Sequence, residues 1–260
     1  MMSPLLDRLY NRLVLSKRPY WNQFRNEHPQ LFRSLYHAYR LYKTYRWLQY
    51  RRIYSKFRNY TLLSKRGYVA NLALCDMFRY VPGAIVECGT WQGGMIAGIA
   101  TLFNDDRDYY LFDSFEGLPP AQEIDGKDPH GNTAVEWQAC QGLPGRGNNL
   151  KAEVEFAEKA MELSATKNVY ILQGWFNETL PRYEGKPIAI LRVDGDWYDS
   201  TMDVLTNLYQ HVVPGGLMIL DDYYYWDGTT KAVHDFLSKN NLSERIQQEP
   251  HMGYAYLIKS

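Results

Sequence analysis

The chain has 260 residues, 45% of them hydrophobic, which is enough for one large α/β domain with an appendage or for two small domains. Three cysteines (Cys75, Cys88 and Cys140) are too few for a disulfide framework or a zinc site. No apolar run approaches the roughly 20 residues of a membrane-spanning helix, and early charges exclude a secretory signal, so we expect a cytoplasmic protein.

The net charge of zero hides an asymmetry between the two ends of the chain. Residues 1–67 carry 15 Lys and Arg against two acidic residues, whereas residues 68–260 carry 14 against 27. The basic part is rich in Tyr and Trp, and its apolar residues repeat at helical spacing, which predicts a helical extension over residues 1–57. Two interpretations stay open for this extension. It docks on the acidic remainder of the chain, or it lies peripherally on the anionic inner face of a membrane.

Residues 58–260 alternate between apolar strands and helices. This order is typical of parallel βαβ units with helices on both faces of the sheet, so we predict an α/β fold. A stretch rich in Gly, Asn and Pro at about 125–149 is expected to be a long loop, which is either a lid or a disordered stretch; we predict that it closes over the acceptor. The expected strands are 84–90, 109–113, 169–174, 188–194 and 216–222, and the expected helices are 65–81, 95–103, 151–164 and 200–210.

The first strand is followed by a glycine-bearing turn, "VECGTWQGG". Gly89 would let the backbone turn sharply, and Gly93 and Gly94 would let a ligand approach the start of the next helix. The spacing is not that of the dinucleotide fingerprint. An acidic residue two positions before the glycine, here Glu87, is what an S-adenosylmethionine site uses to hold the cationic end of the methionine. A tight strand-to-helix turn without a ligand is the alternative.

Two further strand ends carry residues suited to a nucleoside. Asp113 could accept hydrogen bonds from both ribose hydroxyls, or it could cap a helix. Trp175, directly after Gly174, could stack on an adenine ring, or it could belong to the core.

The last two predicted strands end in carboxylates. Asp194, Asp221 and Asp222 cannot all ionise close together unless a cation neutralises them, and oxygen ligands alone select a hard ion such as Mg²⁺. Helix capping and solvation are the alternative. His251 is a further candidate for a proton acceptor, although a lone His is more often structural.

Taken together, these motifs resemble the macrocin O-methyltransferases. "VECGTWQGG", "FDSFEGLP", "GWFNETLP", "LRVDGDWYDST" and "PGGLMILDDY" occur in that family's order, and the resemblance covers residues 58–260. It implies a class I methyltransferase fold with a Rossmann-like, mostly parallel sheet. It also implies Mg²⁺ ligation by Asp194, Asp221 and Asp222. The predicted cofactor site comprises Glu87, Gly89, Thr90, Gly93, Gly94, Asp113, Ser114, Gly174, Trp175 and Asp194.

The resemblance implies an enzyme that methylates a sugar hydroxyl of a glycosylated natural product or cell-envelope glycan. Asp194 is our first candidate for the catalytic base, with Asp196 and His251 in reserve. Two features depart from the family: the aromatic run "YYYWDGTT" after the acidic pair, and residues 1–57, which have no recognised counterpart.

The alternatives are a catechol-type phenol O-methyltransferase and a non-catalytic module that binds glycans or membranes. A nicotinamide oxidoreductase is disfavoured because the third glycine of its fingerprint is missing. We expect a small-molecule or glycan acceptor and a homo-oligomer. No nucleic-acid partner is expected, since no recognition motif accompanies the basic charge.

Overall fold

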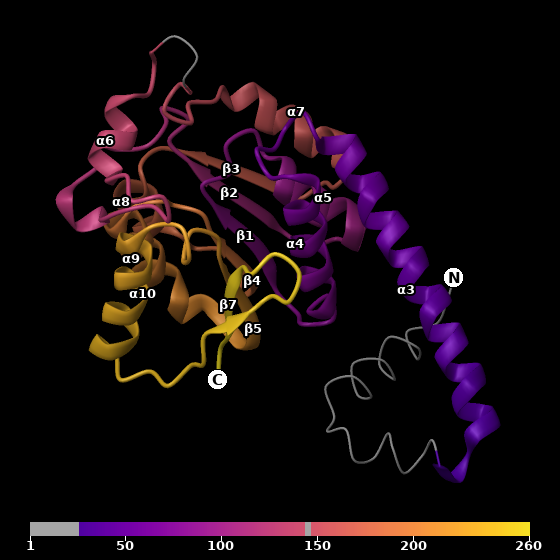
Figure 1. Ribbon diagram of the computed structural model, residues 1–260. Helices are drawn as coiled ribbons and strands as arrows, with labels where there is room; N and C mark the ends of the chain where they lie inside the picture. Colours follow the sequence, from indigo (N-terminus) through magenta and orange to yellow (C-terminus); the bar gives the residue numbers. More distant parts are fainter. Residues whose placement is uncertain (1–25, 144–146) are drawn as a thin grey trace. The chain divides into compact units, whose positions relative to one another are not determined.

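The computed structural model describes residues 26–143 and 147–260, and its centre is a seven-stranded sheet (Figure 1). The strand order is β3-β2-β1-β4-β5-β7-β6. The first five strands in this order are parallel, whereas β7 runs antiparallel to both β5 and β6. The prediction of a mostly parallel α/β sheet is therefore confirmed. The strands are β1 (Ala84–Cys88), β2 (Tyr109–Asp113), β3 (Val169–Gln173), β4 (Ile188–Val193), β5 (Val212–Leu220), β6 (Gln247–Gln248) and β7 (Ala255–Ile258).

The strand order reverses between β1 and β4. From β1 the chain moves outward through β2 and β3, and it then returns to the other side of β1 to form β4 and β5. Cys88 pairs with Val193, and Val193 pairs with Leu220, so three neighbouring strands end level with one another. Ligands of open α/β sheets bind outside the carboxyl ends of the strands at such a reversal. The fold therefore brings together the residues that follow these strands.

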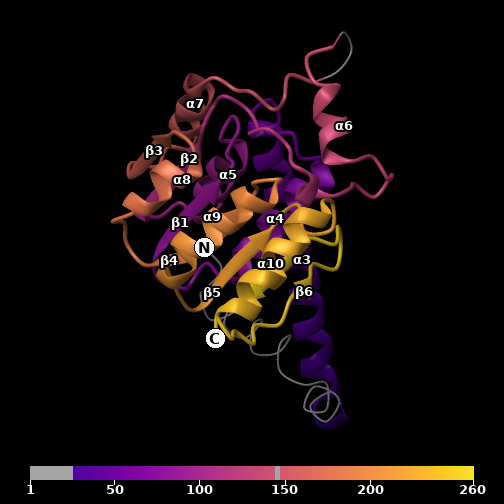
Figure 2. The ribbon, with the colours of Figure 1, turned by 90° about the vertical axis from the view of Figure 1, so that its left-hand side faces the viewer.

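Two sets of helices cover the sheet, one on each face. The first set contains α4 (Lys65–Met77), α5 (Gly94–Phe103) and α7 (Val154–Ser164), and the second contains α8 (Phe176–Thr179), α9 (Tyr198–Leu208) and α10 (Asp227–Lys239). Figure 2 brings α9 and α10 in front of the sheet. Because apolar side chains cover both faces, every residue of β1 and β4 is buried. The predicted helices on both faces are confirmed.

The segment that follows β2 was predicted to be one loop over 125–149, but it contains regular secondary structure. It contains a short helix, α6 (Ala134–Ala139), preceded by the 3-10 turn Glu123–Asp125. The Thr133 hydroxyl accepts a hydrogen bond from the Glu136 amide, and the Glu136 carboxylate accepts one from the Thr133 amide. This reciprocal cap satisfies the first amides of the helix. The sequence "TAVE" carries that capping signal, which the prediction overlooked.

The segment is fastened to the helices that follow β4 and β5. The Asp125 carboxylate accepts the Tyr198 amide at the start of α9, at 2.8 Å. Trp137 of α6 packs edge-to-face on Trp197 and Trp226, with ring centroids 6.1 and 5.8 Å apart. Trp197, Trp226 and the Asp125 carboxylate are buried, and Trp137 is partly buried against the two indoles, so these contacts attach the segment to α9 and α10. Whether the segment closes over an acceptor stays a prediction.

The chain divides into two compact units at Arg51 and Arg52, inside the long helix α3 (Pro29–Phe57). This helix confirms the predicted helical character of residues 29–57, and it contains no Asp or Glu. The predictions for residues 1–25 lie outside the described residues. Among the helices that the structure describes, none is long and apolar enough to span a membrane.

Candidate functional site

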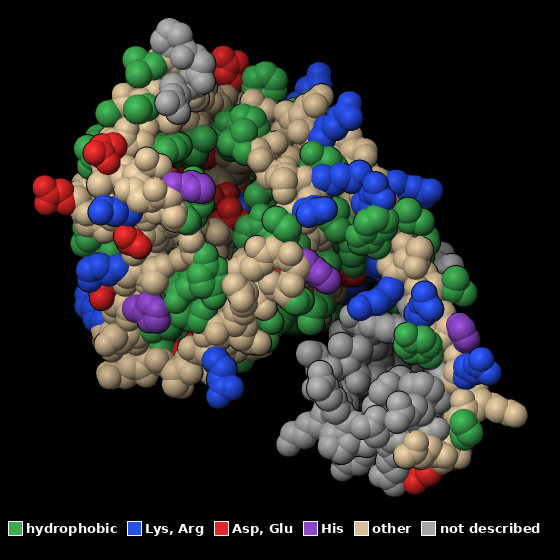
Figure 3. Space-filling model, in the orientation of Figure 1, with side chains coloured by type: hydrophobic (Ala, Val, Ile, Leu, Met, Phe, Trp, Pro, Cys, Tyr) green, Lys and Arg blue, Asp and Glu red, His purple; other side chains and the backbone are tan. Residues whose placement is uncertain are grey.

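A cavity of about 460 Å³ opens at the edge of the sheet where the parallel strands end. Figure 3 shows acidic side chains inside a hollow of this face. The connection from Tyr60 to Leu63 forms part of its wall, together with residues that follow each of the five parallel strands. The predicted site residues that line it are Glu87, Gly89, Thr90, Asp113, Ser114, Gly174, Trp175, Asp194, Asp196, Asp221 and Asp222.

The turn after β1 requires glycine. Gly89 has a φ of +86°, and a Cβ added to it would lie 1.7 Å from the Asp194 carbonyl oxygen. The Asp194 amide also donates to the Cys88 carbonyl at 2.9 Å, so β1 and β4 stay paired up to the cavity. Any side chain at position 89 would push the two strands apart. The predicted sharp turn is confirmed.

Glu87 lines the cavity, but its carboxylate is already engaged by the protein. It is 1% exposed, its Oε1 accepts from Arg192 at 2.9 Å, and its Oε2 accepts from the Ile96 amide at 3.2 Å. Burial raises the pKa of Glu87 to about 8, against the lowering by Arg192. A cofactor ammonium group would therefore have to share this carboxylate with Arg192.

Gly93 and Gly94 have packing reasons to be glycines, and neither lines the cavity. A Cβ at Gly93 would meet Ala157 at 3.1 Å, and one at Gly94 would meet the Tyr60 carbonyl oxygen at 2.4 Å. The Gly94 amide donates to that same carbonyl at 2.9 Å. Gly93 also has a φ of +73°, so a left-handed backbone and close packing around α5 both favour glycine here. Their predicted contact with a ligand stays a prediction.

The carboxylate of Asp113, at the end of β2, holds the backbone of two turns through hydrogen bonds. Its two oxygens accept the amides of Trp91 and Phe115 at 2.8 and 2.7 Å. Burial raises its pKa, whereas these backbone hydrogen bonds lower it. Thr90 lines the cavity too; it is 5% exposed, and its hydroxyl has no hydrogen-bond partner among the described residues. An orphaned buried hydroxyl on a cavity wall fits a ligand that would bond it.

At the end of β3 the chain turns at Gly174, whose φ is +142°. Its amide donates to the Asp113 carbonyl at 2.9 Å, which ties this corner to β2. Trp175 follows and lines the cavity, next to Phe176. Aromatic side chains here and a carboxylate at the end of the neighbouring strand suit an adenine ring and a ribose.

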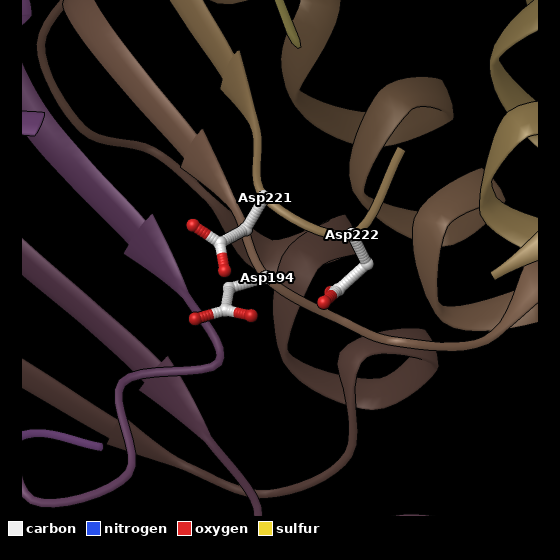
Figure 4. Close-up of side chains that lie close together, drawn as sticks. All are labelled: Asp194, Asp221 and Asp222. Atoms are coloured by element: carbon white, nitrogen blue, oxygen red, sulfur yellow. The ribbon is translucent and has the colours of Figure 1, made fainter. Parts of the chain in front are cut away.

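Asp194, Asp221 and Asp222 converge from the ends of β4 and β5, as Figure 4 shows. One ligand oxygen from each lies within 4.8 Å of those from the others. One oxygen of each carboxylate has a protein partner: Arg192 donates to Asp194 Oδ2 at 2.5 Å and to Asp221 Oδ1, and the Asp196 amide donates to Asp222 Oδ2 at 3.1 Å. Each carboxylate thus keeps one oxygen without a partner among the described residues.

Arg192 links Glu87 on β1 to the carboxylates that follow β4 and β5. It was not among the site residues predicted from the sequence. It is 2% exposed and forms ion pairs with Glu87, Asp194 and Asp221. A lone guanidinium inside an otherwise apolar strand, "IAILRV", was the available signal, because a buried charge requires partners.

One guanidinium does not neutralise this group of acids. Burial raises the pKa of Asp221 to about 7, even though Arg192 lowers it. Burial also raises the pKa of Asp222, and the neighbouring Asp196 and Asp194 add to that rise. Three oxygens without protein partners, no nitrogen or sulfur ligand in the cluster and this excess negative charge suit a hard divalent cation. The residues present therefore fit Mg²⁺.

Asp196 and His251 have different surroundings, although both were candidate bases. Asp196 lines the cavity with a φ of +57°, and its side chain accepts from the Trp226 indole at 3.3 Å. Burial and the neighbouring Asp194 raise its pKa to about 8. His251 is exposed in the turn before β7 and does not line the cavity. The structure therefore does not bring His251 to the site.

Comparisons with known proteins show which family the chain belongs to. The sequence model of the macrocin-O-methyltransferase (TylF) family matches residues 71–256. The chain is 31% identical over 177 residues to a mycinamicin III 3''-O-methyltransferase from Micromonospora griseorubida, covering 66% of this chain and 67% of that protein. It is 35% identical over 174 residues to a demethyldecarbamoylnovobiocin O-methyltransferase from Streptomyces niveus, covering 64% and 62%.

Solved structures show the same fold. The O-methyltransferase NovP superposes with a TM-score of 0.64 at 27% identity, covering 77% of this chain and 82% of that one. The calicheamicin methyltransferase CalS11 superposes with a TM-score of 0.56 at 20% identity, covering 99% and 94%. The fold is that of the class I methyltransferases.

Proposed function

Because the chain belongs to the macrocin O-methyltransferase family, and is thereby an O-methyltransferase, we propose that it transfers a methyl group from S-adenosylmethionine to a sugar hydroxyl. The sugar belongs to a glycosylated natural product or a cell-envelope glycan. The observation that carries the proposal is one cavity lined by both the Asp113–Trp175 corner and the Asp194–Asp221–Asp222 cluster. A donor and an acceptor can meet there.

Each part of the cavity has a proposed task. Asp113 would accept hydrogen bonds from the ribose, Trp175 would contact the adenine, and Asp194, Asp221 and Asp222 would hold Mg²⁺. When bound, S-adenosylmethionine supplies the methyl group, and Mg²⁺ lowers the pKa of a hydroxyl that it contacts.

The chain's own groups would then position the acceptor and take up its proton. Asp194 is the proposed base because it lies at the junction of the cofactor side and the carboxylate cluster; Asp196 is the second candidate, at the same wall. Arg192 fixes the orientation of Asp194 and Asp221 through its two hydrogen bonds. Positioning of reactants in this way can lower a barrier by several kcal/mol.

Labelled S-adenosylmethionine provides the test. The full-length protein would be incubated with Mg²⁺ and glycosides, natural-product extracts or envelope glycan fractions, and the label would be followed into product. Asp221→Asn should abolish transfer while cofactor affinity stays within a few-fold, and excess chelator should also stop the reaction. Asp106→Asn, at an exposed carboxylate outside the cavity, is the matched control. Full activity in excess chelator would refute the role of the metal.

A catechol-type phenol acceptor is the second candidate. The carboxylate cluster with a divalent cation would also suit two adjacent phenolic oxygens. A panel of catechols and glycosides, assayed under the same conditions, separates the two: label in catechols alone would replace the sugar assignment.

We also propose that α3 contacts anionic lipid. The helix has seven Lys and Arg and no acidic residue, and its exposed side chains include Leu41, Tyr45 and Trp47. The Arg51 guanidinium lies 4.3 Å from the centre of the Trp47 ring. Basic and aromatic side chains together favour the interface of an anionic membrane. The predicted homo-oligomer and the docking interpretation stay predictions.

Flotation with vesicles tests the lipid proposal. The full chain should float with anionic vesicles at low salt, less at moderate salt, and not with neutral ones. Replacing exposed Arg33 and Arg40 by Glu should reduce flotation, whereas Lys159→Glu, exposed on α7, should not. Failure to float at either salt would leave only the docking interpretation.

A further inference from the structure

Two buried polar atoms near the site have no hydrogen-bond partner among the described residues, and they are complementary. One is a donor, Nε of Arg192, a residue that is 2% exposed. The other is an acceptor, Oδ1 of Asn71, which lies in α4 and is fully buried. Leaving a buried polar group unbonded costs free energy, so nearly all such groups bond protein or ordered water. Both atoms therefore need a partner.

The first turn of α4 lies over β4, the strand that carries Arg192. The Tyr68 hydroxyl donates to the Gly94 carbonyl at 2.7 Å, at the start of α5 and just after β1. A Cβ added to Gly67 would lie 2.3 Å from the hydroxyl oxygen of Tyr254, the residue directly before β7, which pairs with β5. The start of α4 thus contacts segments on both sides of β4, because β4 lies between β1 and β5 in the sheet.

Asn71 and Arg192 lie at a similar distance from the edge of the sheet where the cavity opens. The helix α4 runs away from that edge, since the connection before it, at 60–63, lines the cavity. Asn71 follows Gly67 by four residues, so it lies on the same face of α4 and one turn, about 5 Å, further along. Arg192 precedes Asp194 by two residues, which is about 7 Å of strand. The two side chains therefore come from matching levels of the helix and the strand.

Arg192 also faces the side of the sheet that α4 covers. It donates to Glu87 at 2.9 Å, and Glu87 accepts the amide of Ile96 in α5, the helix that packs beside α4. One turn after Asn71, the thiol of Cys75 is fully buried; burial raises its pKa, the charge of Arg192 lowers it and that of Glu87 raises it. Both neighbouring turns of α4 thus lie near Arg192, and the buried polar side chain between them is Asn71.

Nε is the one nitrogen of this guanidinium without a partner among the described residues. Nη1 donates to Glu87 and Asp194, and Nη2 donates to Asp221. A guanidinium is planar, so a partner on Nε fixes the plane that contains the other donors. That plane sets the direction in which Asp194 and Asp221 are held. A group that bonds Nε therefore positions two carboxylates of the cluster.

We propose that one buried water joins the two residues, accepting from Arg192 Nε and donating to Asn71 Oδ1, and that Asn71 is thereby a positioning residue of the site. Buried waters commonly bond polar groups that the protein leaves unsatisfied. Through this water, Asn71 holds the guanidinium in the plane that orients Asp194 and Asp221. The consequence for metal binding rests on the proposed function, whereas the link between Asn71 and Arg192 does not.

An isosteric pair of variants isolates the hydrogen bond. In Asn71→Thr the hydroxyl can donate to the Gly67 carbonyl, as Asn71 Nδ2 does at 3.1 Å, and can still accept from the water. Asn71→Val has the same shape and can do neither. Asn207→Val is the control, because Asn207 Nδ2 donates in the same way to the Asp203 carbonyl on α9, at 2.8 Å, but Asn207 does not line the cavity.

Binding of Mn²⁺ to the full-length protein, followed by electron paramagnetic resonance, gives the first readout. Loss of a group that orients metal ligands typically weakens metal binding by about 10–100-fold. Asn71→Val should therefore bind Mn²⁺ at least about tenfold more weakly than the parent, and Asn71→Thr should stay within about threefold of it. Asn207→Val should bind Mn²⁺ as the parent does.

Urea unfolding in the presence of chelator gives a second readout, which needs no metal. The factor by which Asn71→Val lowers the folding equilibrium constant should be about fivefold smaller in an Arg192→Met background than in the parent, because the link is then already lost. Asn207→Val should have the same effect in both backgrounds. A crystal structure of the unmodified protein gives the third readout: we expect an ordered water within hydrogen-bond distance of Asn71 Oδ1 and Arg192 Nε.

The outcomes separate this inference from the proposed function. With a parent that binds Mn²⁺, equal affinities in the Val and Thr variants overturn the inference, and so does the absence of coupling to Arg192 or of the ordered water. Should Asn71→Val not fold, the crystal structure of the parent decides. If the parent binds no Mn²⁺, the metal of the proposed function fails, and the coupling and the water still decide this inference.

Discussion

Replacing Arg192 by Met should destabilise the protein by about 3–5 kcal/mol, the usual cost of removing one partner from a buried ion pair. Met keeps most of the side chain's length, so the loss is mainly one of charge and hydrogen bonds. The largest share comes from Glu87, because it is 1% exposed and its carboxylate would keep only the Ile96 amide as a partner. Asp194 and Asp221 contribute less, since their side chains are 27% and 12% exposed and water can reach them.

Urea unfolding followed by circular dichroism would measure this change. A second substitution makes the test specific when all variants are measured above pH 8, where the Glu87 carboxyl, with its pKa of about 8, is ionised. Glu87→Gln then removes the orphaned charge, so the double variant should recover at least about 1 kcal/mol relative to Arg192→Met. Asp106→Asn, at an exposed carboxylate outside the cavity, should recover nothing in the same background. A loss below about 1 kcal/mol, or no recovery in the double variant, would refute the view of Arg192 as the charge centre of the site.

Three further predictions follow from the site. Asp113→Ala should weaken S-adenosylmethionine binding by about 1–3 kcal/mol in calorimetry, because hydrogen bonds to a charged group are lost; unchanged affinity would mean that the pocket is misplaced. Gly89→Ala should yield little folded protein, because its Cβ would lie 1.7 Å from the Asp194 carbonyl oxygen; a soluble variant with the parent's melting temperature would contradict this. Burial raises the pKa of Glu87 from 4.5 to about 8, so its contribution to stability is fully present below pH 4.5 and is lost as the pH rises toward 8. Glu87→Gln should therefore lose less stability than the parent between pH 5 and 8, and equal losses in urea titrations would exclude this role.

Much of the fold could be predicted from the sequence because local patterns determine it. Apolar runs of five to six residues, such as "AIVEC" and "IAILRV", are long enough for buried parallel strands, and the helices between them follow from periodicity. The glycine at position 89 and the carboxylates after β4 and β5 could be assigned to a ligand edge, since residues after parallel strands share one edge of the sheet. The capping signal of α6 was also present, although it was not used.

Tertiary structure decided how the site's groups are paired. Position along the chain could not reveal that Arg192 lies between Glu87 and Asp221, because the three residues lie on β4, on β1 and directly after β5. Nor could it show that Gly94 leaves room for the Tyr60 carbonyl, or that His251 lies outside the cavity. Pairing, burial and the resulting pKa shifts depend on which segments the sheet brings together, and that order is a property of the whole fold.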